Sequence, residues 1–528
     1  MPSNLSFNKS LVFTAILIPL NKLLLANSKV KGISRKEYYI CEDFLKKLDL
    51  KRKFLTNLAL LLVLNLLVKP FWIFGIDRSV QNLVGAEEYG LYFSLFSFSV
   101  LINIILDLGI TNFNNRSVAQ NPKIVSEYFS KIIPLKFALS LIYAVIVILA
   151  GLMVGYSAEQ FQLLYLLIFN NFLLSFILYL RSNISGLQFY KTDSLLSVLD
   201  RLIMILICSL LLWGHISDEP FRISWFVYAQ TFSYLLTMGV ALGVVLSKCG
   251  RIRLNFNLRY GLNILKQSYP YALLILLMSF FNRIDSVMME RMLSDGKEQA
   301  GIYAQAFRLL DAVVMFAFLF AGLLLPMFSN MLKNNEAIGS LLKLSFSLLI
   351  VPAISLVVAS AFYGEEIMTM LYHEHVDVSS RIFIRLIFAF LFISTTYIFG
   401  TLLTANGSLK QLNILAAITV FMNIGLNLLL IPRFKAEGAA YASVASQGFF
   451  AVSQVFLARR IFNLRSDYSV IVRLFVFSVC LILSGIILES ANISWIIGFL
   501  GLSLLGLAFS WVLRILTPKE VIEILRAG

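Results

Sequence analysis

The stretch GAEEYGLYFSLF, from Gly85 to Phe96, recurs 211 positions later as GKEQAGIYAQAF, from Gly296 to Phe307. Five positions are identical in the ungapped alignment: Gly85/Gly296, Glu87/Glu298, Gly90/Gly301, Tyr92/Tyr303 and Phe96/Phe307. Each copy follows a long apolar segment and opens another, which favours a duplication over chance similarity between two loops. Duplicated halves in a polytopic membrane chain are typical of transporters, whose substrate sites lie between the repeats.

The composition is that of an integral membrane protein. Hydrophobic residues make up 59% of the 528 residues and charged residues only 14%, and the mean hydropathy is +0.83. These values exclude a soluble globular domain. The net charge of +15 indicates basic cytoplasmic loops rather than nucleic-acid binding.

Fourteen segments approach the roughly 20 apolar residues that a spanning helix needs. They are predicted near 54–76, 90–111, 131–155, 161–181, 195–213, 222–247, 269–291, 302–326, 343–363, 383–405, 411–432, 437–459, 470–488 and 493–515. The repeat divides them into six, six and two, and six is even, so both halves cross in the same direction as parallel repeats. We therefore predict an all-α fold of about fourteen transmembrane helices, with two six-helix bundles and two additional helices.

The predicted domain boundaries follow from this division. They are 1–53, a cytoplasmic or interfacial extension; 54–247, the first bundle; 248–268, a basic linker on anionic lipid; 269–461, the second bundle; and 462–528, two further helices and a short tail. One set of alternate loops holds twenty Lys and Arg residues and the other set seven. The positive-inside rule places the richer set, and both termini, in the cytoplasm.

Neither a metal site nor a disulfide framework is indicated. The four cysteines are scattered, and two of the three histidines, His373 and His375, share one loop without further ligands. A structural zinc site needs four ligands and a secreted scaffold needs paired cysteines. No bound cofactor is expected, and the chain has no GxxxxGK[ST] phosphate loop for direct ATP use.

Three blocks carry a resemblance to a known family. They are NLLVKPFWIFGIDRSVQNLVGAEEYGLYFSLFSFSVLINIILDLGITNFNNRSVAQNP (Asn65 to Pro122), FFNRIDSVMMERMLSDGKEQAGIYAQAFRLLD (Phe280 to Asp311) and TANGSLKQLNILAAITVFMNIGLNLLLIPRFKAEGAAYASVASQ (Thr404 to Gln447). From about residue 50 to the end the chain resembles bacterial polysaccharide flippases of the O-antigen type. These are the lipid-linked oligosaccharide exporters of the multidrug/oligosaccharidyl-lipid/polysaccharide exporter superfamily. The resemblance implies two bundles around a central cavity; the first 50 residues depart from the family pattern.

Basic residues inside the predicted spans point to an anionic substrate. Lys69, Arg283 and Arg308 lie well within apolar segments, where a cation costs about 2.5–3.5 kcal/mol unless it faces a cavity or a partner. Guanidinium groups bind phosphate oxygens in a bidentate manner, so we predict these three residues as the diphosphate site. For Arg308 the alternative is an ion pair with Asp311, three residues further on.

Acidic residues in or near the spans are candidates for coupling to sodium ions or protons. Asp107, Asp285 and Asp311 are of this kind, and a plain ion pair is an equal alternative for each. Two further arginines, Arg181 and Arg201, lie near predicted cytoplasmic ends, where headgroup anchoring is the usual role.

The repeated motif also predicts local structure. Gly90 and Gly301 are expected to let an outer loop turn tightly into its helix, with Tyr92 and Tyr303 as anchors at the membrane interface. Prolines within the spans, Pro70 among them, are expected to kink helices.

The predicted function is an inner-membrane flippase for a polyprenyl-diphosphate-linked oligosaccharide. It would move its substrate from the cytoplasmic to the outer leaflet by alternating access, for surface polysaccharide biosynthesis. The resemblance implies membrane lipids and glycan polymerases or ligases as partners. The alternatives are a cation-coupled multidrug exporter of the same superfamily and a flippase for the peptidoglycan precursor. An enzyme is disfavoured, since the outer loops are too short to form a catalytic domain.

Overall fold

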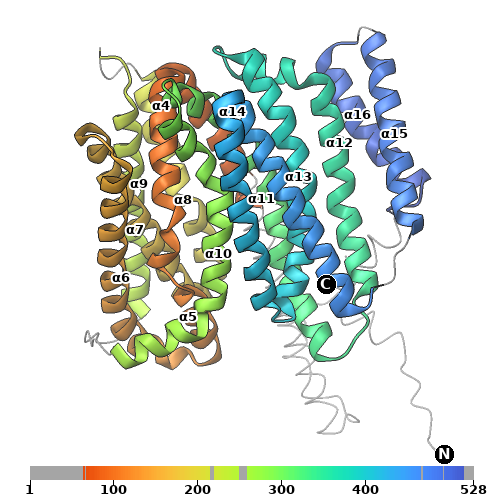
Figure 1. The fold of residues 1–528 in the computed structure, drawn as a ribbon. Helices are drawn as coiled ribbons and strands as arrows, with labels where there is room; N and C mark the ends of the chain where they lie inside the picture. Colours follow the sequence, from red (N-terminus) through yellow and green to blue (C-terminus); the bar gives the residue numbers. More distant parts are fainter. Residues whose placement is uncertain are drawn as a thin grey trace, which may run out of the picture. The chain divides into compact units, whose positions relative to one another are not determined.

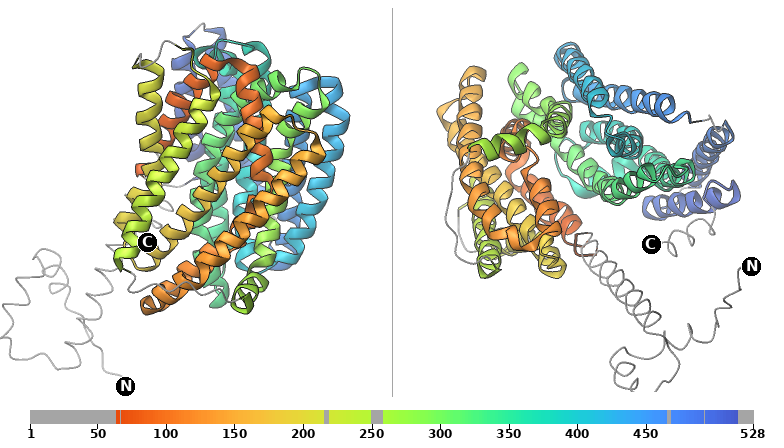
Figure 2. Two further views of the ribbon diagram at one scale, coloured as in Figure 1. Left: turned by 90° about the vertical axis from the view of Figure 1, so that its left-hand side faces the viewer. Right: turned by 90° about the horizontal axis from the view of Figure 1, so that it is seen from below.

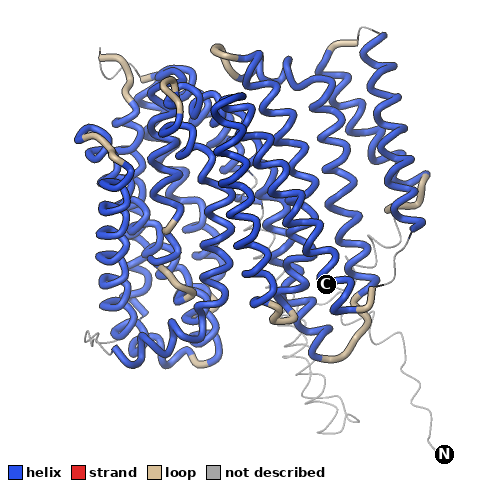
Figure 3. Tube along the Cα trace, in the orientation of Figure 1, coloured by secondary structure: helices blue, strands red, loops and turns tan. Residues whose placement is uncertain are grey.

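The computed structural model describes residues 63–65, 67–214, 219–248, 258–464, 468–491 and 493–516. The predicted extension 1–53, the start of the first segment and the tail from 517 lie outside the described residues. Within the described ranges all regular structure is helical, with no strand (Figure 3).

The helices follow one another through short turns. In chain order (Figure 1) they are η1 (Trp72–Asp77), α4 (Arg78–Leu101), η2 (Asn103–Leu106), α5 (Ile110–Gln120), η3 (Pro122–Ile124), α6 (Val125–Val154), α7 (Ala158–Gly186), α8 (Tyr190–Trp213), α9 (Ile223–Lys248), α10 (Leu258–Met292), α11 (Gly296–Lys333), α12 (Gly339–Leu371), α13 (Val376–Ala405), α14 (Leu409–Phe462), α15 (Tyr468–Ser490) and α16 (Trp495–Val512).

Eleven helices in these ranges are long and apolar enough to cross a membrane. The all-helical, multi-pass class is thereby confirmed, whereas the number fourteen remains a prediction. Two predicted spans, 411–432 and 437–459, are the arms of α14, which is broken at Lys435 (φ 51°). Across this break, a Cβ atom on Gly438 would lie 2.3 Å from the carbonyl oxygen of Leu430, so the backbones of the two arms touch. Figure 1 shows these arms diverging from the α14 label.

The first two predicted spans are not among the eleven: residues 54–62 of the first lie outside the described residues, and the second is interrupted after Leu101, where η2 follows α4. Helical residues before Trp72 contain Pro70, and the chain then passes through the π-helix η1. Proline removes a backbone donor and clashes with the preceding turn, so a local change of helix type is its expected consequence. Gly85 (φ 78°) breaks α4 into two parts.

Helices α7 and α13 each pack against several others. Helix α7 packs against α4, α5, α6, α8 and α9, whereas α13 packs against α11, α12 and α14. Helices α15 and α16 pack on α12. The right-hand view of Figure 2, from below, shows the helices up to α9 and those from α10 onward as two neighbouring groups. Helix α10 begins at Leu258, so the described half of the predicted linker is helical.

The two copies of the repeat meet in the middle of the molecule. A Cβ atom on Gly90 would lie 1.8 Å from the carbonyl oxygen of Lys297, and one on Gly301 would lie 1.9 Å from that of Ala86. Ala86 and Lys297 occupy equivalent positions of the repeat, so the contact is reciprocal, as at an isologous interface. Helices α4 and α11 therefore cross with their backbones in contact.

This crossing corrects the roles predicted for the motif. Gly90 and Gly301 lie within helices rather than in turns; the break in the first copy is at Gly85. Tyr92 and Tyr303 are buried, with 2% and 1% of their surfaces exposed, and so are not interface anchors. Glycine is needed here for close approach of two backbones, a role that the sequence of one copy does not distinguish from a turn.

Candidate functional site

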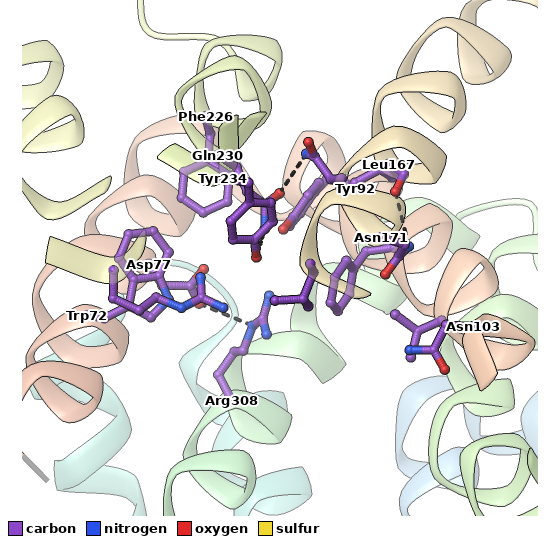
Figure 4. Close-up of a pocket in the computed structure, with 15 residues that line it drawn as sticks. Trp72, Asp77, Tyr92, Asn103, Leu167, Asn171, Phe226, Gln230, Tyr234 and Arg308 are labelled. Atoms are coloured by element: carbon purple, nitrogen blue, oxygen red, sulfur yellow. Dashed lines mark hydrogen bonds and ion pairs between the residues drawn. The ribbon is translucent and has the colours of Figure 1, made fainter. Parts of the chain in front are cut away.

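A cavity of about 250 Å³ lies beside the crossing of the two repeats (Figure 4). Its walls come from η1, α4, η2, α7, α8 and α9, and Arg308 of α11 closes it from the second half. The lining residues are aromatic, amide and charged: Trp72, Asp77, Tyr92, Phe96, Val100, Asn103, Leu167, Asn170, Asn171, Leu174, Arg201, Phe226, Gln230, Tyr234 and Arg308. Polar groups that converge on a cavity beside aromatic side chains are typical of a ligand site.

Arg308 enters the cavity as one partner of a buried ion pair. Its Nε atom lies 3.2 Å from Oδ2 of Asp77 and donates a hydrogen bond of 3.0 Å to the hydroxyl of Tyr89. Its guanidinium also lies 5.3 Å from the ring centroid of Phe93. Asp77, with 1% of its surface exposed, is placed by the π-helix η1. Only part of the Arg308 charge is therefore available to a ligand.

Arg201 is the second guanidinium group of the cavity. It lies 5.3 Å from the ring centroid of Trp72, and Trp72 stacks in turn on Phe226 at 5.6 Å. Its ion pair is with the neighbouring Asp200, at 3.6 Å. Within the described part of the chain no hydrogen bond from Arg201 is formed, so its donors remain available to a ligand.

The position of Arg201 corrects the anchoring role predicted for it. Its place near a span end in the sequence suggested a lipid headgroup, but α8 turns the side chain towards the cavity. Arg181, predicted with it, is paired with Asp193 at 2.7 Å. The Asp-Arg pair at 200–201 in an apolar segment was the signal that could have singled out Arg201.

Arg283 is linked to Arg308 through one carboxylate. Its Nη2 atom lies 3.2 Å from Oδ2 of Asp311, and Nη1 of Arg308 lies 3.9 Å from the same atom. Nη1 of Arg283 is buried and has no hydrogen-bond partner among the described residues. The structure thus brings two of the three predicted basic residues together. Their shared partner Asp311 is occupied by two cations and so is poorly placed for coupling.

Lys69, the third predicted basic residue, is half-buried and is not part of the cavity wall. It lies within the electrostatic influence of Arg201, Asp200 and Arg181. The charged neighbours of Lys69 therefore lie in the first half of the molecule. Lys69 and Arg283, which were predicted to bind the diphosphate together, do not form one site.

Asp107 and Asp285, two of the three acids predicted for ion coupling, differ in their partners. Asp107 pairs with Lys136 at 2.7 Å, a lysine with 2% of its surface exposed that the sequence analysis did not single out. Asp285, with 1% exposed, accepts hydrogen bonds from Asn427 at 2.7 Å and from the Tyr303 hydroxyl at 3.0 Å. Among the described residues, no basic side chain pairs with Asp285.

Comparisons with known proteins identify the family. Residues 54–332, more than half of the chain, match the model of a family described as polysaccharide biosynthesis protein. The chain belongs to this family, which confirms the predicted resemblance. It is also 26% identical over 216 residues to the capsular polysaccharide biosynthesis protein CapF of Staphylococcus aureus. That match covers 39% of this chain and 54% of CapF, so the chain spans about half the length of the curated relative it matches.

Solved structures share the fold. The lipid II flippase MurJ in an inward closed conformation superposes with a TM-score of 0.65 at 16% identity, over 86% of this chain and 98% of that one. A mutant form of the MATE transporter VcmN of Vibrio cholerae gives 0.54 at 11% identity, over 78% and 98%. The eukaryotic MATE transporter AtDTX14 gives 0.54 at 15% identity, over 78% and 95%. The architecture is therefore one found in flippases and transporters.

Proposed function

We propose that this protein is a flippase for a polyprenyl-diphosphate-linked oligosaccharide, moving it from the cytoplasmic to the outer leaflet of the inner membrane. The observation that carries the proposal is that two guanidinium groups, Arg201 of the first half and Arg308 of the second, line one cavity. A cavity of the first half that the second half closes with Arg308 suits alternating access by movement of one half against the other, and two guanidinium groups suit a diphosphate.

The charges around the cavity favour an anion. The charged residues of the cavity wall are two cations, Arg201 and Arg308, and one anion, Asp77. A cationic drug would require the opposite balance, so the multidrug alternative is disfavoured. The family of polysaccharide biosynthesis proteins supports a glycan on the diphosphate.

Direction follows from the membrane potential. A charge that crosses the membrane along the potential gains about 2.3 kcal/mol per 100 mV. A diphosphate with about two negative charges moves outward favourably when the inside is negative, by roughly twice that amount if the protein carries no compensating charge. The potential alone would then suffice to drive export.

Asp285 is our proposed site for any coupling cation, because it combines a buried carboxylate with amide neighbours and no basic partner in the described chain. Oδ1 of Asn427 is buried beside it and accepts no hydrogen bond from a described residue. Oxygen ligands of this kind suit a sodium ion, and the carboxylate alone suits a proton.

In liposomes with an imposed sodium or proton gradient, the Asp285→Asn variant should move substrate at a rate that no longer depends on the gradient. A dependence equal to that of the wild type would reject the site.

Arg201→Ala tests the proposed function most cleanly, because Arg201 is not locked in a buried pair. Hydrogen bonds to charged groups contribute about 1.5–3 kcal/mol, so flipping of a fluorescent polyprenyl-diphosphate oligosaccharide should fall about tenfold to a hundredfold. Arg201→Lys should retain part of the activity. The measurement uses proteoliposomes and a membrane-impermeant enzyme that modifies the sugar once it is exposed.

Arg473→Ala is the matched control, since Arg473 lies on α15 and bonds only to the carbonyl of Arg514 among the described residues. It should flip at the wild-type rate. Equal rates for Arg201→Ala and the wild type would contradict the diphosphate site. Export of a cationic dye in place of the lipid would favour the multidrug alternative, and flipping restricted to a peptide-bearing precursor would favour the peptidoglycan alternative.

A further inference from the structure

The wall of the cavity formed by α7 and α9 carries a row of hydrogen-bonding side chains that the diphosphate does not use. We propose that this row, Asn170, Gln230 and Tyr234, is a saccharide subsite that binds the first sugar of the lipid-linked substrate. The inference rests on the proposed function, because the diphosphate on Arg201 and Arg308 would bring that sugar into the same cavity.

The three side chains form a chain of hydrogen bonds with two free ends. Nδ2 of Asn170 donates to Oε1 of Gln230 at 3.3 Å, and Nε2 of Gln230 donates to the hydroxyl of Tyr234 at 3.2 Å. The hydroxyl hydrogen of Tyr234, the carbonyl oxygen of Asn170 and the second N–H of each amide remain. The row therefore presents both donors and an acceptor to a ligand.

The acceptor end is left unpaired in the protein itself. Asn170 has 4% of its surface exposed, and its Oδ1 atom has no hydrogen-bond partner within the described part of the chain. A buried polar atom without a partner costs about 1–3 kcal/mol, and most such atoms are satisfied in folded proteins. An unpaired amide oxygen in a cavity wall indicates a ligand that donates a hydrogen bond.

A sugar matches this wall better than the other parts of the substrate. Each sugar hydroxyl can both donate and accept, whereas a polyprenyl chain can do neither and a diphosphate is an acceptor that the guanidinium groups satisfy. Figure 4 shows Gln230 and Tyr234 on one side of the cavity and Arg308 entering from the other. A ring whose phosphate lies at the arginines would thus present its hydroxyl edge to the row.

The size of the cavity limits the subsite to about one sugar. Pockets for drug-sized ligands are about 300–1,000 Å³, and this cavity holds about 250 Å³. The remaining sugars of an oligosaccharide would extend beyond it. The row is therefore expected to read the sugar next to the diphosphate and to tolerate variation further along the glycan.

The test compares binding of two soluble probes to the purified full-length protein by calorimetry. The probes are farnesyl diphosphate and farnesyl diphosphate that carries one N-acetylglucosamine. The wild type should bind the glycosylated probe about tenfold more tightly, which corresponds to about 1.4 kcal/mol. Asn170→Leu should abolish this preference, measured as the ratio of the two dissociation constants.

Tyr234→Phe is a second variant that is expected to fold normally, because it removes a single oxygen atom. It should reduce the preference several-fold, whereas Tyr228→Phe, on the exposed face of the same helix, should not change it. The subsite would be overturned if the wild type bound the two probes equally. It would also be overturned if the preference survived both Asn170→Leu and Tyr234→Phe. Neither result would contradict the proposed flippase function. If neither probe binds, or if Arg201→Ala leaves farnesyl diphosphate binding unchanged, the diphosphate function fails and the subsite with it.

Discussion

At the level of single residues, one buried charge has a complete set of partners. This charge is Lys136 of α6: its ammonium donates to Oδ1 of Asp107, to the carbonyl of Leu106 at 3.0 Å and to Ser175 at 2.9 Å. All three donors of the ammonium are thereby used. The pair fixes the short helix η2 against α6 and α7.

Lys136→Met is expected to destabilise the protein by about 3 kcal/mol, because it leaves the Asp107 carboxylate without its cation. We place the effect at the low end of the range for buried pairs, since 26% of the Asp107 side chain is exposed. The double substitution Lys136→Met with Asp107→Asn should recover part of the loss. Unfolding in detergent measures all three variants; a single substitution as stable as the wild type would contradict a stabilising pair.

At the level of helices, the sequence predicts where apolar segments lie but not how they are broken. The spans from 125 to 248 and from 339 to 405 agree with predicted segments, because about 20 apolar residues are sufficient to indicate a helix. The π-helix at Trp72–Asp77 cannot be predicted from apolar length. Pro70 indicates that the helix is distorted nearby, but not that a π-helix follows. Yet this element places Asp77 beside Arg308, so part of the site depends on a feature that hydropathy does not report.

The helix crossing at Gly90 and Gly301 gives a prediction at this scale. Gly90→Ala should destabilise the protein by about 1–3 kcal/mol, the usual range for overpacking, because the new methyl group would collide with a backbone carbonyl that cannot rotate away. Gly239→Ala on α9 is the control, since open space surrounds that position. It should be neutral or slightly stabilising, as expected for glycine in a helix. Similar unfolding midpoints for both variants would argue against the close crossing.

At the level of the whole molecule, the halves are joined by polar contacts at one end as well as by the glycines. Gln160 of α7 donates to Glu290 of α10 at 2.9 Å, and Arg291 donates to Gln160 at 3.0 Å and contacts Glu290. Its guanidinium lies 4.4 Å from the ring centroid of Tyr156. The loop charges predict that this end faces outward, and on that prediction these contacts close the outer side of the molecule.

A single sequence does not show which residues, far apart along the chain, pair with one another in the site. Arg283 and Arg308 are recognisable because a cation in an apolar segment is rare, but Asp77 is more than 200 residues away from Arg308. Arg201 looked like a headgroup anchor for the same reason: the ring that its guanidinium contacts, Trp72, lies more than 100 residues earlier in the chain. Short-range rules such as three- and four-residue spacing therefore favoured Asp311 over Asp77 as the partner of Arg308.

Arg291→Ala is expected to shift the protein towards states that are open at this end. A cysteine in place of the buried Ser97, in a background without native cysteines, should react several-fold faster with a membrane-impermeant reagent. Arg381→Ala breaks a comparable ion pair, to Glu437 at 2.8 Å, that lies within the second half alone. That control should leave the labelling rate unchanged; an equal increase in both variants would show general loosening rather than opening.

The reciprocal contact at the two glycines also bears on how such a cavity can evolve. A half-length ancestor that joined to itself through this contact would have surrounded its substrate with two copies of every group, as symmetry requires. Fusion of the copies lifts that requirement. Position 300 is Ala where the first copy has Tyr89, and position 97 is Ser where the second has Arg308. A duplication of this kind would allow a symmetric scaffold to place different chemical groups on the two sides of one cavity.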